Sequence, residues 1–77
     1  MVSSYSQAVA AEVRAEVARQ RRSQGDLAAK MGWKQPYISR RLVGEVAFDI
    51  DELARLADEL GVPLEQFTRV TEGATPR

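Results

Sequence analysis

The chain has 77 residues, of which 44% are hydrophobic and 29% charged, the composition of one small globular domain rather than of a disordered segment. It contains neither cysteine nor histidine, which excludes disulfides and thiolate zinc sites and removes the commonest general base and metal ligand. The formal net charge is zero, and we expect no enzymatic activity, no metal and no other cofactor.

The first segment predicts a helix that runs to about Arg21. Its start can be capped by Ser3, Ser4 or Ser6, and Ser4 with Gln7 three residues later fits the pattern of a capping box. Three valines then recur every four residues and form one apolar stripe along the helix: Val9, Val13 and Val17.

Two short helices joined by three residues are predicted next. Ser23 is the expected N-cap of the first, and Gly32 is its C-cap because glycine can adopt the positive φ of a helix end. The second helix has Pro36 in its first turn, where the missing N–H had no partner to lose, and Gly44 ends it.

The last part of the chain predicts two further helices. Asp49 and Glu52 form an N-cap and N3 pair before the strongest amphipathic pattern, which Gly61 ends. Pro63 opens a short final helix, and residues 71–77 are expected to be a flexible tail beyond a domain of residues 1–70. The predicted core consists of the following apolar side chains: Val9, Val13, Val17, Leu27, Ala28, Met31, Trp33, Ile38, Leu42, Ile50, Leu53, Leu56, Leu60, Val62, Leu64 and Phe67.

The middle pair of helices has the layout of a helix-turn-helix. Four motifs are informative in their joint order: Ser-Gln-Gly-Asp-Leu-Ala at 23–28, Gly32, Gln-Pro-Tyr-Ile-Ser-Arg at 35–40, and Gly44. With the apolar series of the fourth helix, they make the chain resemble the lambda-repressor-like (Cro-type) helix-turn-helix family over about residues 9–67. The resemblance implies an all-α, compact five-helix DNA-binding domain in which helices 2 and 3 form the helix-turn-helix.

Charge is distributed unevenly along the chain. Residues 14–41 carry a net charge of +6, whereas residues 45–77 carry −5. A basic half suits an anionic partner such as DNA. The alternative is that the charged side chains only form the solvent-exposed faces of helices.

The resemblance also implies roles for individual residues, because the third helix of this family enters the major groove. The implied base contacts are Gln35, Pro36, Tyr37 and Arg40, and the implied phosphate contacts are Ser23, Gln24, Lys34, Arg41, Arg19 and Arg22. Pro36 has no donor and can simply stiffen the helix start, and Tyr37 can instead pack against Trp33. If Ile38 and Leu42 face inward, Arg40 points outward and Arg41 lies on a flank, although the choice between the two as base reader stays open.

Two places depart from the family pattern. Many members pair an arginine of the first helix with a glutamate just after the third, and Val17 and Leu42 occupy those places here. Both partners are therefore replaced by apolar residues, which leaves no unpaired buried charge.

These features predict a sequence-specific DNA-binding transcriptional regulator, such as a small repressor of a phage or bacterial operon, acting in the bacterial cytoplasm or nucleoid. Its expected partner is a palindromic double-stranded operator, bound by a homodimer. The candidate interface is the fifth helix around Leu64, Phe67 and Val70, and the alternative is that Phe67 closes the monomer core.

The same residues fit two other functions. An antitoxin that also binds a toxin, and a protein-interaction domain that retains the fold, remain open. No small-molecule ligand is evident. No apolar run approaches the roughly 20 residues of a membrane span, and residues 1–7 lack the pattern of a signal peptide, so no membrane partner is expected.

Overall fold

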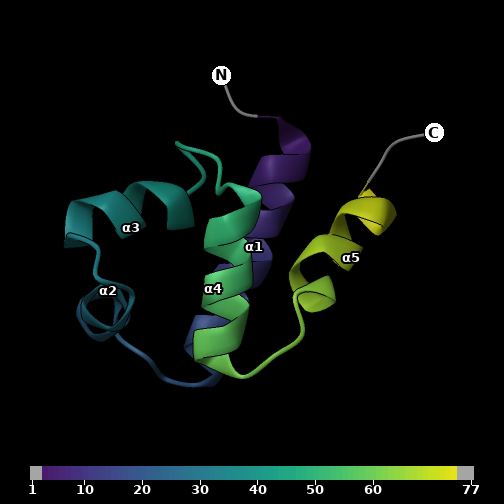
Figure 1. Ribbon diagram of the computed structural model, residues 1–77. Coiled ribbons are helices and arrows are strands. Elements are labelled where there is room, and N and C mark those ends of the chain that lie inside the picture. The colour runs from purple at the N-terminus through teal and green to yellow at the C-terminus, as the bar shows by residue number, and fades with distance from the viewer. Residues whose placement is uncertain (1–2, 75–77) are drawn as a thin grey trace.

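The computed structural model describes the backbone of residues 3–74 and the side chains of residues 3–69. This part of the chain contains five α-helices and no strand: α1 (Ser4–Arg19), α2 (Gln24–Met31), α3 (Gln35–Leu42), α4 (Ile50–Leu60) and α5 (Glu65–Ala74). Helices α2 and α3 lie on one side of α1 and α4, and α5 lies on the other (Figure 1). The predicted all-α, five-helix architecture is confirmed.

Most helix ends follow the predicted capping residues. The Ser23 hydroxyl accepts from the Asp26 N–H at 3.0 Å, and Gly32 and Gly61 end α2 and α4 with φ of 74° and 71°. At α4, Asp49 and Glu52 form the predicted reciprocal capping box. These ends could be predicted because each depends on residues within one helical turn.

The two ends of α1 differ from the prediction. Of the three candidate serines, Ser3 is the N-cap, and its hydroxyl accepts from the Ser6 N–H at 3.1 Å. The capping box expected of Ser4 and Gln7 is therefore wrong, because Ser4 is the first residue of the helix. The helix ends at Arg19 rather than Arg21, because Arg21 adopts a positive φ of 55° and turns the chain toward α2. At the other end of the fold, α5 continues to Ala74, beyond the boundary expected at residue 70, and residues 75–77 lie outside the described residues.

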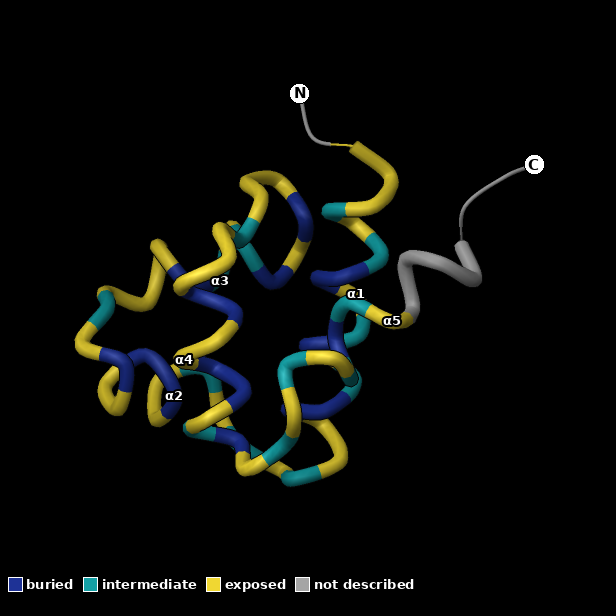
Figure 2. The backbone as a smooth tube through the Cα atoms, turned by 45° about the vertical axis from the view of Figure 1, so that its right-hand side comes forward, coloured by how far each residue is buried: buried dark blue, intermediate teal, exposed yellow. Residues whose placement is uncertain are grey.

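The core lies where the inner faces of all five helices meet, as the dark blue segments of Figure 2 show for the side chains described. Phe67 of α5 is completely buried, so the alternative in which it closes the monomer core is the one observed. Trp33, Val62 and Leu64 are only partly buried and pack around the edge. The buried apolar side chains are Val9, Ala10, Val13, Val17, Leu27, Ala28, Met31, Ile38, Leu42, Leu53, Leu56, Ala57, Leu60 and Phe67.

One predicted core residue is wrong. Ile50 is 62% exposed because it is the first residue of α4, and the first turn of that helix lies at the edge of the core. Phe48, in the preceding loop, packs against the core instead.

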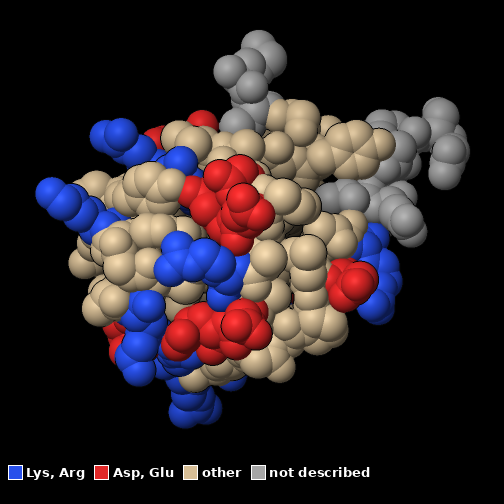
Figure 3. Space-filling model, viewed as in Figure 1, with Lys and Arg blue, Asp and Glu red and all other residues tan. Residues whose placement is uncertain are grey.

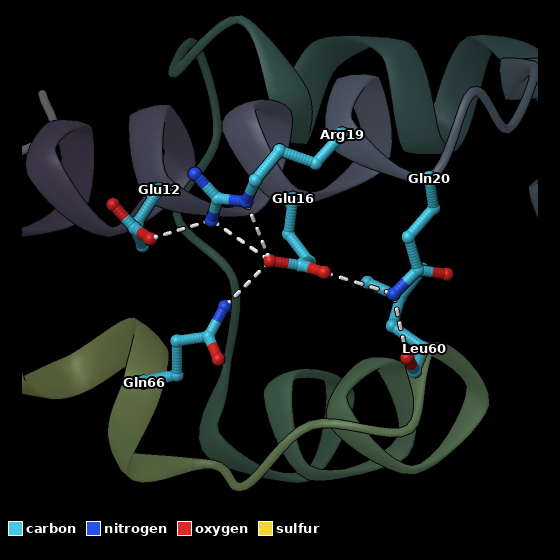
Figure 4. A network of polar contacts seen from close by, with 6 residues as sticks. All are labelled: Glu12, Glu16, Arg19, Gln20, Leu60 and Gln66. Atoms are coloured by element: carbon cyan, nitrogen blue, oxygen red, sulfur yellow. Dashed lines mark hydrogen bonds and ion pairs between the residues drawn. The ribbon is translucent and has the colours of Figure 1, made fainter.

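A buried carboxylate joins α1 to α5. Glu16 is only 8% exposed and accepts hydrogen bonds from Arg19 at 2.9 Å, Gln20 at 2.9 Å and Gln66 of α5 at 2.7 Å (Figure 4). The Gln20 amide also donates to the Leu60 carbonyl at 2.7 Å, at the end of α4. The network therefore fixes α4 and α5 against the last turns of α1 and supplies the partners that a buried charge requires.

This network predicts a pH-dependent stability. Hydrogen bonds from Gln20 and Arg19 hold the pKa of Glu16 below its ordinary value of 4.5, although burial raises it. A lowered folded-state pKa stabilises the protein above the unfolded-state pKa, and this contribution is lost as the pH falls from 4.5 through the lowered value. Glu16→Gln should therefore lower the free energy of unfolding at neutral pH. The difference in this free energy between the variant and the unsubstituted protein should shrink below about pH 4.5.

Urea unfolding at a series of pH values measures this difference. Glu45→Gln is the matched control, because it removes one carboxylate from an exposed loop position. A difference between the Glu16→Gln variant and the unsubstituted protein that stays constant down to about pH 3 would contradict a stabilising Glu16 carboxylate.

Candidate nucleic-acid interface

Helices α2 and α3 are joined by a turn that is fixed on both sides. The Trp33 N–H donates to the Ala28 carbonyl at 2.8 Å, and the Arg55 guanidinium of α4 donates to the Met31 carbonyl at 2.8 Å. The same guanidinium lies 5.6 Å from the centre of the Trp33 ring. These contacts satisfy two of the four free carbonyls at the end of α2 and hold the turn that leads into α3.

The other end of α3 is held from α1. The Arg14 guanidinium donates to the Leu42 carbonyl in the last turn of α3. This contact satisfies a free carbonyl, and the positive charge is favourable at a helix C-terminus. Val17 and Leu42, the apolar residues at the two places where the sequence departs from the family pattern, are both buried, with 7% and 2% exposure.

The outward face of α3 presents polar side chains. Ile38 and Leu42 face the core, which leaves Gln35, Pro36 and Arg40 exposed. The Arg40 side chain makes no hydrogen bond or ion pair with any side chain or backbone group of the described residues. Its guanidinium is therefore available to a ligand.

The start of α2 lies beside the start of α3. A Cβ atom added at Gly25 of α2 would lie 3.7 Å from the Gln35 Oε1 atom, in ordinary contact. Gln24, half-buried, is the first residue of α2, and the Ser23 hydroxyl before it is already occupied as the N-cap. The Gln35 side chain thus lies beside the first turn of α2, the turn that Gln24 begins.

A cluster around Glu52 covers the flank of α3 next to α4. The Tyr37 hydroxyl donates to Glu52, and the Arg41 Nε atom lies 3.2 Å from Glu52 Oε1. The Arg41 guanidinium stacks on the Tyr37 ring, 3.7 Å from its centre, and the Trp33 and Tyr37 ring centres are 5.2 Å apart. We call Tyr37, Arg41 and Glu52 the Glu52 cluster.

The Glu52 cluster alters two pKa values. Burial raises the pKa of Glu52, but hydrogen bonds from the Tyr37 hydroxyl, the Asp49 N–H and Arg41 outweigh burial, and the pKa lies below its ordinary value. The hydrogen bond to Glu52 raises the pKa of the Tyr37 hydroxyl. The carboxylate is therefore ionised and the phenol protonated at neutral pH. The sequence assigned Glu52 only a capping role, because nothing local reveals its contacts with α3.

Half of the eight basic side chains in residues 14–41 are engaged within the fold. Four contact carboxylates or a carbonyl: Arg14 (Leu42), Arg19 (Glu12 and Glu16), Arg22 (Asp26 and Glu59) and Arg41 (Glu52). The other four are exposed and have no such contact with a described residue: Arg21, Lys30, Lys34 and Arg40. The sequence alone therefore overstates the charge available to a ligand.

The charges are separated on the surface. Basic side chains project at the edge over α2 and α3, and acidic side chains gather over α4 (Figure 3). The acidic residues on α4 are Asp51, Glu52, Asp58 and Glu59. A polyanion would therefore approach the face formed by α2 and α3 and be repelled from α4.

Other kinds of site are poorly supported. An open hollow of about 220 Å³ between α2 and α4 is lined by Lys30, Met31, Arg55, Asp58 and Glu59. Among the side chains of residues 3–69, no group of three metal-ligating side chains lies together. None of the helices described is both long enough and apolar enough to cross a membrane.

Comparisons with known proteins agree with this architecture. The crystal structure of the DNA-binding domain of BldD superposes with a TM-score of 0.75 and 30% sequence identity, covering 87% of this chain and 97% of that domain. The BldD DNA-binding domain of S. venezulae gives a TM-score of 0.74 at 30% identity, with coverages of 84% and 97%. A search of curated protein sequences found no match to the chain.

A family model described as helix-turn-helix matches residues 13–67. This match confirms the resemblance to lambda-repressor-like domains that the motifs indicated. The chain belongs to the helix-turn-helix family.

Proposed function

We propose that this protein is a sequence-specific DNA-binding regulator of transcription that inserts α3 into the major groove of its operator. The observation that carries the proposal is the exposed Arg40 guanidinium on the outward face of α3, without a partner among the described residues. The similarity to two DNA-binding domains at 30% identity supports the same ligand. Binding of chromosomal or phage DNA would put this regulator in the cytoplasm or nucleoid, where it would act as a repressor.

The proposed contacts divide by position. Arg40 and Gln35 would read base edges, because arginine pairs with guanine and glutamine with adenine through two hydrogen bonds each. Pro36 and the exposed edge of Tyr37 would line the groove beside them. Lys34, with Ser23 and Gln24 at the start of α2, would contact phosphates. Arg19 and Arg22 already contact carboxylates, so any phosphate would have to compete for them.

We also propose that two copies bind one palindromic operator, because a single α3 reads too few base pairs to define a site. Of the expected interface residues, Phe67 lies inside the core and cannot contribute to the dimer contact, Leu64 packs against the core, and the side chain of Val70 lies outside the described residues. Three of the exposed large apolar side chains follow α3 in the chain and become the candidates instead: Val43, Val46 and Ile50.

The salt dependence of DNA binding tests whether DNA is the ligand and how many basic side chains contact its phosphates. If only the four unpartnered basic side chains contact phosphates, the slope of log K against log salt should be no steeper than about −3.6 per protomer. Eight available basic side chains would instead give a slope of about −7. Lys34→Ala should flatten the slope by about 0.9 and weaken all DNA sequences alike. Fluorescence anisotropy on duplex DNA over a range of salt concentrations gives these slopes.

The matched control is Arg69→Ala, which removes one positive charge from α5 on the side of the fold away from α2 and α3. It should leave the slope unchanged. Absence of salt-dependent binding to any duplex drawn from a random library would overturn the proposed function.

A further inference from the structure

Helix α3 carries two adjacent arginines, and the structure treats them differently. The Arg41 side chain is 17% exposed, contacts Glu52 and stacks on Tyr37, whereas Arg40 is exposed and unpartnered among the described residues. Both side chains have the same chemistry and nearly the same position along the helix. Their surroundings, not their types, therefore determine which one can meet a ligand.

The carboxylate that holds Arg41 is itself fixed on several sides. The Glu52 side chain is 10% exposed and accepts from the Tyr37 hydroxyl, from the Arg41 Nε atom and from the Asp49 N–H at 2.9 Å. Withdrawal of Arg41 toward a phosphate would leave a nearly buried carboxylate without its cation, which is strongly unfavourable. The cation–π contact with Tyr37 would be lost in the same movement.

We propose that Glu52 is a positioning residue that withholds Arg41 from the DNA backbone and leaves Arg40 as the guanidinium on α3 that contacts the operator. The inference rests on the proposed function and refines it. A second free arginine on α3 would bind any phosphate and raise affinity for all sequences equally, because phosphate contacts carry no base information. By restraining Arg41, Glu52 increases the ratio of specific to nonspecific binding.

The decisive variant is Glu52→Gln. Glutamine retains an oxygen that can accept from the Asp49 N–H, so it preserves the capping box while it removes the charge that holds Arg41. The freed Arg41 should add one phosphate contact. The slope of log K against log salt should steepen by about 0.9, and affinity for nonspecific duplex should rise about fivefold to tenfold at 0.1 M salt.

Two controls separate the release of Arg41 from the general effect of charge. Asp51→Asn removes a negative charge from the neighbouring exposed position of α4 without a contact to Arg41, and it should leave the slope unchanged. Combining Glu52→Gln with Arg41→Gln should restore the slope of the unsubstituted protein. Circular dichroism checks that each variant is folded.

A further variant tests the proposal even if Glu52→Gln does not fold. Arg41→Gln alone should leave the slope unchanged, because Arg41 does not contact phosphate in the unsubstituted protein, while the unpaired Glu52 carboxylate should lower the free energy of unfolding. A slope that flattens by about 0.9 would overturn the inference. This result can be told apart from a failure of the proposed function. If the protein did not bind DNA, the unsubstituted protein would show no salt-dependent binding to duplex DNA at all.

Discussion

Replacing Phe67 with alanine should leave about half or more of the molecules unfolded at 25 °C. Phe67 is completely buried and joins α5 to the core formed by the other four helices. Truncation of a buried phenylalanine to alanine costs about 3–5 kcal/mol, and a domain of this size has a total stability of about 3–5 kcal/mol. The folded and unfolded states should therefore be comparably populated, or the unfolded state should dominate.

Far-UV circular dichroism with urea titration measures this effect. The matched control is Ile50→Ala, which truncates a large apolar side chain that is 62% exposed and should change the free energy of unfolding by less than about 0.5 kcal/mol. If Phe67→Ala lost less than about 1 kcal/mol, α5 would not be part of the cooperative core.

The largest expected effect on DNA recognition comes from Arg40→Ala. A bidentate contact between arginine and guanine contributes about 1–3 kcal/mol of discrimination, so the variant should lose roughly fivefold to 150-fold preference at one or two base pairs of each half-site. Nonspecific binding should be largely retained. Because the exposed Arg40 side chain makes no hydrogen bond or ion pair with a described residue, its truncation should leave the fold unchanged.

Competition between the selected operator and its single-base variants measures this preference. Arg41→Ala is the matched control on the same helix, and it should not alter the preferred sequence because Arg41 contacts Glu52. The opposite result, in which Arg41→Ala erases the base preference and Arg40→Ala does not, would mean that α3 meets the groove through the neighbouring residue.

The sequence predicts helix ends well because capping is local. Ser23, Gly32 and the pair Asp49 and Glu52 each act within one turn, so spacing alone identifies them. Ile50 is the instructive failure. It stands three residues before Leu53 and thus on the same helical face, but periodicity does not indicate that the first turn of α4 lies at the edge of the core.

The long-range polar contacts of the fold and of the candidate site could not be predicted from local patterns. The Tyr37 hydroxyl bonds to a carboxylate 15 residues away, and Glu16 accepts from a glutamine 50 residues away. Helix periodicity placed Arg41 on a flank of α3 and suggested a phosphate contact. Only the packing of α4 against α3 shows that a carboxylate of this chain already holds that guanidinium.

The outward face of α3 also bears on how such a regulator can diversify. Gln35 and Arg40 are exposed and contribute nothing to the buried core, so substitutions there should change the recognised sequence while leaving the free energy of unfolding nearly constant. Ile38 and Leu42, on the opposite face of the same helix, have no such freedom. Under the proposed function, one short helix would separate what the protein recognises from what keeps it folded, and new operator preferences would arise by point mutation without compensating changes elsewhere.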